Sequence, residues 1–191
     1  MIETARLRIR ELALDDAEVV IEILNDPDFI RFVADRGIRT VEAGKRYLQE
    51  GPLNSYRQHG FGLWAVELKT ADKSLVPDKS LVFDKPLVPD KPLVIGMCGL
   101  LQRDFLAAPD IGFAFLPKYR GYGYAFEAAQ ATLNYGWQQL GMTRILAITD
   151  PQNEDSIRLL TRLGLEFSGM TTHPGSDVQL NLYWFDGSRE E

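Results

Sequence analysis

Apolar and polar residues alternate near the start of the chain, in the stretch RLRIREL (6–12). Leu7 and Ile9 are separated by arginines, and a period of two is typical of a half-buried β-strand. A later stretch, RILAIT (144–149), is continuously apolar, as expected of a strand that is buried on both faces. The other predicted strands are 61–69, 92–101, 110–116, 165–170 and 178–185.

Apolar residues three or four positions apart predict helices. The longest such run covers 124–140 and ends before Gly141, a residue suited to the end of a helix. Shorter helical runs begin at Asp15 and Asp16 and after the capping residues Thr40 and Asn153. The predicted order is strand, two helices, three strands, helix, strand, helix and two strands. This order indicates a mixed α/β domain around one central sheet.

Length and charge narrow the function classes. The chain has 191 residues, of which 45% are hydrophobic and 25% charged, which is typical of one globular domain. The net charge of −6 argues against nucleic acid as a partner. The charged first residues do not resemble a secretory signal, and no apolar run reaches the about 20 residues that span a bilayer. We therefore expect a cytoplasmic protein that is not bound to a membrane.

Few residues are available for metal or disulfide chemistry. Cys98 is the only cysteine, which excludes an intramolecular disulfide, and there are two histidines. This set argues against a structural zinc site. We expect no metal, and we expect Cys98 to be a packing residue rather than an acyl carrier.

A hexapeptide beginning Asp-Lys occurs four times in succession from Asp72. Removing residues 72–89 would leave an ordinary hairpin between the second and third predicted strands. The sequence therefore predicts a single domain, 1–191, with an insertion at 72–89. Each unit pairs one Asp with one Lys, so the insertion adds no net charge. The alternative is an arm whose Leu-Val pairs dock on a partner subunit.

The stretch LPKYRGYGYAFEAA (116–129) joins a predicted strand to the longest predicted helix. Gly121 and Gly123 let the backbone approach a ligand, and the start of a helix supplies free N–H donors. Arg120 adds a charge suited to phosphate. These features predict a pyrophosphate site, although a glycine-rich connection without a ligand remains the alternative. A dinucleotide fingerprint would need glycine at 126, which is Phe126, and a P-loop would need Gly-Lys-Ser/Thr.

This loop resembles the Gln/Arg-x-x-Gly-x-Gly/Ala signature of the GNAT acetyltransferase superfamily. RLRIREL, NDPDFIRF, DIGFAFLPKYRGYGYAFEA and NEDSIRLLTRLGLEFSG resemble the branch of RimJ/RimL-type ribosomal-protein N-terminal acetyltransferases. The resemblance covers 1–71 and 90–191. It implies the GNAT fold, with a central, splayed, mostly antiparallel sheet flanked by helices.

The resemblance also implies where acetyl-CoA binds, between the fourth and fifth strands. Phe115 would contact the pantetheine arm through its backbone, and Asn153 and Ser156 would contact the cofactor from the next helix. The backbone amides that would hold the pyrophosphate belong to Arg120, Gly121, Tyr122, Gly123, Tyr124 and Ala125.

The implied reaction is direct attack of a neutral amine on the thioester. An α-amine, with a pKa near ~8, is more easily deprotonated than a lysine. A main-chain N–H near Phe115 would stabilise the oxyanion. Many relatives protonate the leaving thiolate with a tyrosine, but that position is Leu160 here, which leaves Ser156 or water. Asp110 is our candidate for the base.

Other residues are weaker candidates: Glu67 and His59 for the base, and Trp64, Phe29 and Phe32 for the lining of an acceptor pocket. The predicted function is an acetyl-CoA-dependent N-acetyltransferase that acts on a protein N-terminus or a small-molecule amine. The alternative is a non-catalytic module that binds acyl-CoA. The assembly stays open between monomer and homodimer.

Overall fold

A computed structural model describes residues 1–69 and 93–186, so the predicted insertion at 72–89 lies outside the described residues. The described strands form one sheet in the order β1-β2-β3-β4-β5-β6-β8-β7. All neighbouring strands are antiparallel except β5 and β6, which are parallel. The strands are β1 Ile2–Glu3, β2 Leu7–Glu11, β3 Leu63–Leu68, β4 Leu93–Leu101, β5 Asp110–Phe115, β6 Arg144–Thr149, β7 Glu166–Thr172 and β8 Gln179–Asp186.

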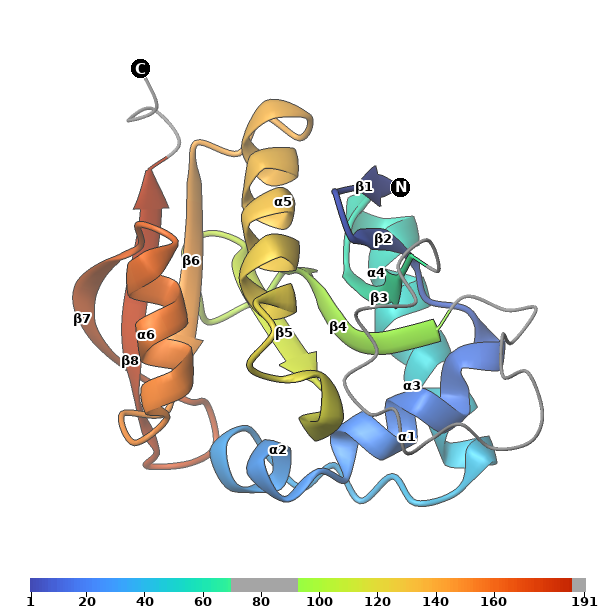
Figure 1. Cartoon of the computed structure of the whole chain (residues 1–191). Helices are drawn as coiled ribbons and strands as arrows, with labels where there is room; N and C mark the ends of the chain where they lie inside the picture. Colours follow the sequence, from blue (N-terminus) through green and yellow to red (C-terminus); the bar gives the residue numbers. More distant parts are fainter. Residues whose placement is uncertain (70–92, 187–191) are drawn as a thin grey trace.

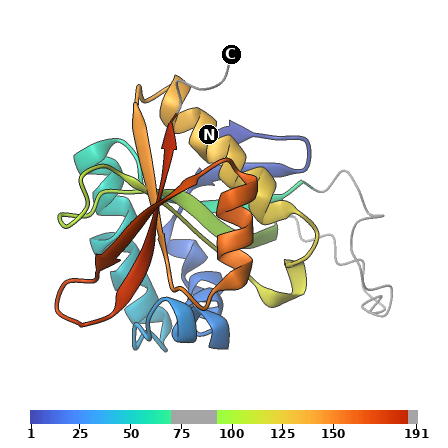
Figure 2. The same ribbon diagram turned by 90° about the vertical axis from the view of Figure 1, so that its left-hand side faces the viewer.

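Helices cover both faces of this sheet (Figures 1 and 2). The helices α5 and α6 lie on one face, and α3 and α4 lie on the other. The helices are α1 Ala17–Leu24, α2 Pro27–Phe32, α3 Val41–Glu50, α4 Pro52–His59, α5 Tyr124–Gln138 and α6 Glu154–Arg162. None of the helices described in 1–69 and 93–186 is long and apolar enough to cross a membrane. The predicted mixed α/β fold with a mostly antiparallel sheet is confirmed.

The first part of the chain contains more helices than the sequence predicted. Asn25 ends α1, and Asp26 directly after it begins the next helix. Its carboxylate accepts a hydrogen bond from Phe29 N at 3.3 Å, and Pro27 occupies the first turn of α2. Pro52 likewise starts α4 directly after Gly51. Proline suits a first helical turn, so the same residues can end one helix and begin another. The short β1 was also missed.

The sheet opens between β5 and β6. Only one pair of residues is in register, Asp110 with Leu146, and Leu146 N donates to Pro109 O at 2.8 Å. Past this pair the two strands diverge, as Figure 1 shows. This is the splayed sheet that the family resemblance implied.

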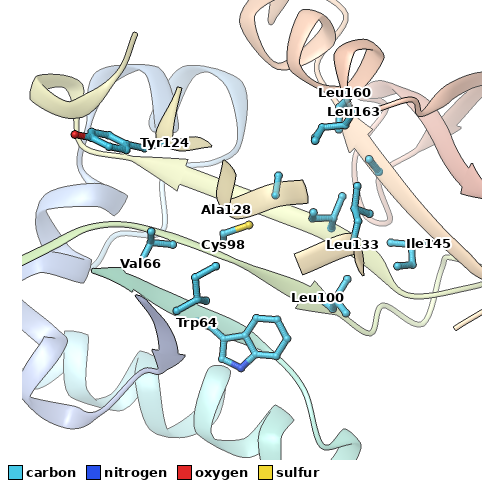
Figure 3. Close-up of a cluster of buried hydrophobic side chains, with 14 of the residues drawn as sticks. Trp64, Val66, Cys98, Leu100, Tyr124, Ala128, Leu133, Ile145, Leu160 and Leu163 are labelled. Carbon is cyan, nitrogen blue, oxygen red and sulfur yellow. The ribbon is translucent and has the colours of Figure 1, made fainter. Parts of the chain in front are cut away.

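The core between α5 and the sheet holds Cys98 (Figure 3). Its Sγ lies 3.4 Å from the Oγ1 of Thr132, and burial raises the pKa of the thiol to about 12. A thiol in this state stays protonated at neutral pH, which agrees with a packing role. Trp64 is also a core residue, because its ring contacts Tyr135 edge-on at 5.6 Å.

Candidate active site

A cavity of about 700 Å³ lies between the end of β5 and α6. Its walls come mainly from the end of β5, the loop and first turn of α5, one face of α6, and α2, and Ile23 of α1 adds to them. The residues from β5 are Phe113, Ala114 and Phe115, and those from α2 and its end are Asp28, Phe29, Phe32 and Val33. Most residues that the sequence predicted to bind the cofactor lie here, because Phe115, Arg120, Gly121, Gly123, Tyr124, Ala125, Asn153 and Ser156 all line this cavity.

The loop before α5 has the backbone of an anion site. Gly121 and Gly123 have φ angles of +81° and +80°, which other residues adopt only at a cost. Gly123 is the N-cap of α5, a helix of 15 residues. The first N–H groups of a helix have no partner within it, and the helix dipole is positive at that end. These groups fit a pyrophosphate.

Arg6 holds this loop from outside, a role that the sequence did not predict. Its side chain donates to Tyr122 O at 2.9 Å and to Glu127 at 2.6 Å, and it lies 4.6 Å from the centre of the Tyr124 ring. In a trans peptide the C=O and the following N–H point in opposite directions. By binding the carbonyl of Tyr122, Arg6 therefore turns the N–H of Gly123 away from itself.

Arg120 lies in the cavity wall, but its guanidinium is already bound. It forms ion pairs with Asp26 and Asp28 of the α2 region, and its Nε donates to Phe115 O at 2.9 Å. The sequence indicated a charge that is free to meet phosphate. The structure instead shows an arginine that ties α2 to the end of β5.

The backbone of Phe115 faces the opening. Leu116 N donates to Ile95 O at 3.0 Å, so Leu116 turns its polar groups toward β4. Neighbouring residues of a strand turn their backbone groups to opposite sides. Those of Phe115 and Phe113 therefore point away from β4, which agrees with the bond from Arg120 to Phe115 O.

The start of α6 forms the opposite wall. Asn153 caps this helix, because its Oδ1 accepts a hydrogen bond from Ser156 N at 3.1 Å. Leu160 is only 1% exposed and belongs to the core (Figure 3). Tyr119, in the short helix Pro117–Tyr119 before the loop, also lines the cavity. Burial, with a smaller effect of Glu22, raises the pKa of Tyr119, so its phenol stays protonated at neutral pH.

Asp110 does not line the cavity. It is 1% exposed, and Arg103 Nε donates to its Oδ1 at 2.8 Å. Burial raises the pKa of Asp110, although Arg103 acts in the opposite direction. Side chains alternate along a strand, so Asp110 shares a face with Ala114, which packs with α1 and α3. A substrate amine would have to reach it from that face.

The two alternative bases also lie outside the cavity wall. Glu67 is buried and accepts a hydrogen bond from Arg10 at 2.6 Å. His59 ends α4, and its ring lies 5.8 Å from that of Phe61.

Sequence reasoning missed one face of α6. Asp155, Arg158, Leu159 and Arg162 line the cavity along this helix. Their spacing of three and four residues places them on one side of a helix, and this could have been read from the sequence. The sequence does not show, however, that this side faces a cavity rather than solvent.

Proteins of similar sequence and fold agree with the family resemblance seen in the sequence. The uncharacterized N-acetyltransferase YnaD of Bacillus subtilis is 27% identical over 168 residues, which is 88% of this chain and 84% of that protein. The crystal structure of a GNAT-family acetyltransferase from Bacillus anthracis has a TM-score of 0.72 at 24% identity, and covers 98% of this chain and 99% of its own.

Two other similar structures contain coenzyme A. RimL, a ribosomal L7/L12 α-N-protein acetyltransferase, has a TM-score of 0.73 at 12% identity, with 96% of this chain and 95% of that chain covered. A spermidine N-acetyltransferase from Vibrio cholerae, with CoA and spermine, has a TM-score of 0.72 at 12% identity, with 97% and 98% covered. At this identity the likeness is one of fold. The family profile described as "Acetyltransferase (GNAT) domain" matches residues 6–166, and this chain therefore belongs to the GNAT acetyltransferase family.

Proposed function

We propose that the protein transfers an acetyl group from acetyl-CoA directly to a primary amine. The observation that carries this proposal is the cavity between the end of β5 and α6, which extends to the glycine loop before α5. A thioester arm lying along β5 and a pyrophosphate at the loop would use both features. RimL and the Vibrio cholerae spermidine N-acetyltransferase bind coenzyme A on the same fold, which supports the choice of ligand.

Different residues of the chain would bind the different parts of acetyl-CoA. Backbone N–H groups from Gly121 to Ala125 would bind the pyrophosphate. The N–H of Arg120, which the sequence also predicted for this role, already donates to Pro117 O at 3.1 Å. The backbone of Phe115 would hold the pantetheine arm and offer an N–H to the thioester oxygen, where negative charge develops during attack. Asn153 and Ser156 would contact the cofactor from α6. No metal is needed for this chemistry.

Proton transfer is assigned to two side chains. Asp110 would accept the proton of the amine through water from the face of the sheet that carries α1 and α3. Its raised pKa brings a carboxylate closer to the pH at which a general base is effective. Ser156 would protonate the leaving thiolate directly or through water, because Leu160 has no proton to give.

The acceptor would be the N-terminus of a protein or a small-molecule amine. The RimJ/RimL-type branch suggests the first and the spermidine N-acetyltransferase the second, since both share the fold. We place the reaction in the cytoplasm, where a reducing environment suits the free, buried thiol of Cys98.

A non-catalytic module that binds acyl-CoA is the second candidate, and the buried Leu160 favours it. The two candidates differ in one experiment. The protein is incubated with acetyl-CoA and a panel of polyamines, amino-acid amides and peptides with free N-termini. Thiol release is followed, and products are identified by mass spectrometry, with acetyl-CoA alone as the control.

Acceptor-dependent thiol release together with an acetylated amine would support the enzyme. Binding of acetyl-CoA in calorimetry, with no product from any acceptor class, would favour the binding module. A protein that does not bind acetyl-CoA would contradict both candidates.

A further inference from the structure

The charged residues in the cavity wall are unequally neutralised. They are Asp28, Arg120, Asp155, Arg158 and Arg162. Arg120 is paired with Asp28 and also with Asp26. Arg158 is paired with Asp155 and also with Glu154. Each of these two clusters therefore contains one more carboxylate than arginine, which disfavours a bound anion.

Arg162 is the exception. No carboxylate within the described parts of the chain, 1–69 and 93–186, lies within ion-pair distance of it. Its guanidinium carbon lies 4.3 Å from the centre of the Phe126 ring. Phe126 is in the first turn of α5, so Arg162 extends from α6 across to the helix end that carries the anion loop. A guanidinium stacked on a ring keeps its in-plane N–H donors free for a phosphate.

We infer that Arg162 binds the 3′-phosphate of coenzyme A. The inference rests on the proposed function. The pyrophosphate already has the backbone donors of the loop, whereas the 3′-phosphate is a monoester with a charge of about −2 and needs a cation. Arg162 lies against Phe126, which follows Gly123 by three residues. Arg162 and Phe126 together form the subsite for the nucleotide end of the ligand.

The test compares two ligands by calorimetry: acetyl-CoA and acetyl-3′-dephospho-CoA, which lacks only this phosphate. The wild-type protein should bind acetyl-CoA about tenfold more tightly than acetyl-3′-dephospho-CoA. This factor is the scale of a hydrogen bond to a charged group at an exposed site. Arg162→Gln should lose this preference by weakening acetyl-CoA alone. Arg162→Lys should keep part of it, because it keeps the charge without the fork of donors.

Arg144→Gln is the matched control. Arg144 also stacks on a ring, 5.2 Å from the centre of the Trp184 ring, but it lies on β6 outside the cavity wall. The substitution changes the net charge by the same amount and should leave both affinities unchanged.

Equal weakening of both ligands by Arg162→Gln would overturn the inference, since Arg162 would then act on the pyrophosphate or on the shape of the cavity. Unchanged affinities, or a wild-type protein with no preference, would overturn it as well. In each of these outcomes the wild-type protein still binds acetyl-CoA, so the proposed function is not contradicted. A wild-type protein that binds neither ligand would instead overturn the proposed function, and this inference with it.

Discussion

At the scale of single residues, the glycine loop before α5 depends on backbone conformations that only glycine adopts easily. At Gly123 a larger residue is disfavoured by the backbone angle φ and not by lack of space. A Cβ there would come no closer than 3.4 Å to another atom, the Nη2 of Arg6. An alanine at φ +80° costs about 1–2 kcal/mol, and the loop can relieve this by rotating its N–H groups out of place.

We therefore expect Gly123→Ala to weaken acetyl-CoA binding about tenfold, the equivalent of that cost. Calorimetric titration measures the affinity. Gly141→Ala is the control, because Gly141 also has a positive φ, of +65°, but lies outside the cavity wall. The melting temperature should decrease by a similar amount in both variants. Wild-type affinity in Gly123→Ala would mean that the loop does not hold the ligand.

Asp110 provides a pH-dependent test of the proposed base. A base acts only when ionised, and burial raises the pKa of this carboxyl above its usual 3.8. The rate should therefore increase with pH through a range higher than that of an ordinary carboxylate. In Asp110→Asn we expect kcat to fall about 10²-fold, with acetyl-CoA affinity unchanged. The increase of the rate with pH in the acidic range should also disappear.

Asp16→Asn is the control for removing a buried carboxylate paired with an arginine. Arg10 binds Asp16 through two hydrogen bonds. Burial raises the pKa of Asp16, but the bonds from Arg10 and from Ala13 N outweigh this and lower it. Asp16 thus stabilises the fold above its usual pKa, and this contribution is lost as pH falls through the lowered value. Asp16→Asn should lower the melting temperature at pH 7 but keep kcat. Wild-type kcat in Asp110→Asn would remove Asp110 from the mechanism.

At the scale of elements, the strands were predictable because period-two and continuous apolar patterns report burial directly. The predicted 144–149 coincides with β6, and the predicted 110–116 exceeds β5 by one residue. The six-residue α2 was missed because Asn-Asp-Pro is equally a stop and a start signal. The function of α2, which contributes Phe29 and Phe32 to the cavity, depends on a contact with Arg120 more than 90 positions away.

That contact leads to a prediction about α2. Arg120 donates to Asp26, Asp28 and Phe115 O, and a lysine cannot maintain this set of bonds. In Arg120→Lys we expect α2 to detach from the cavity wall. The KM for the amine should rise about tenfold, as for the loss of one charged hydrogen bond, while acetyl-CoA affinity changes little.

Asp28→Asn should likewise raise the KM for the amine and change acetyl-CoA affinity little, because it removes a carboxylate that pairs with Arg120. If Arg120 is instead a phosphate ligand, as the sequence alone suggests, Arg120→Lys would weaken acetyl-CoA binding and leave the KM for the amine unchanged. Steady-state kinetics and calorimetry on the same preparations distinguish the two outcomes.

At the scale of the whole molecule, the site combines segments that are far apart in the chain. Arg6 in the first residues supports the carbonyl of Tyr122, and α6 contributes Arg162 beside Phe126. The glycine motif was predictable from sequence because its residues are adjacent and its mechanism is local. Arg6 and Arg162 were not, because their roles exist only after the sheet has brought β2, α5 and α6 together.

The predicted insertion at 72–89 can be tested through the strands that flank it. Leu68 ends β3, Leu93 begins β4, and the two residues are paired in the sheet. A short connection can therefore join them, and Asp90 and Lys91 would remain to form the turn. Removing 72–89 shortens the connection about fourfold, which lowers the free-energy cost of loop closure by ~1 kcal/mol.

We expect the shortened protein to fold, with a melting temperature equal to or above that of the full chain and with unchanged acetyl-CoA affinity, because the cavity is built from other segments. Melting, calorimetry and sedimentation of both proteins measure this. The control replaces 72–89 by a Gly/Ser segment of equal length, which keeps the connection long but removes the Leu-Val pairs. If both variants lose stability, or if both change from dimer to monomer, the repeat docks on the fold or on a second copy. If only the shortened protein is affected, the length of the connection matters and the repeated sequence does not.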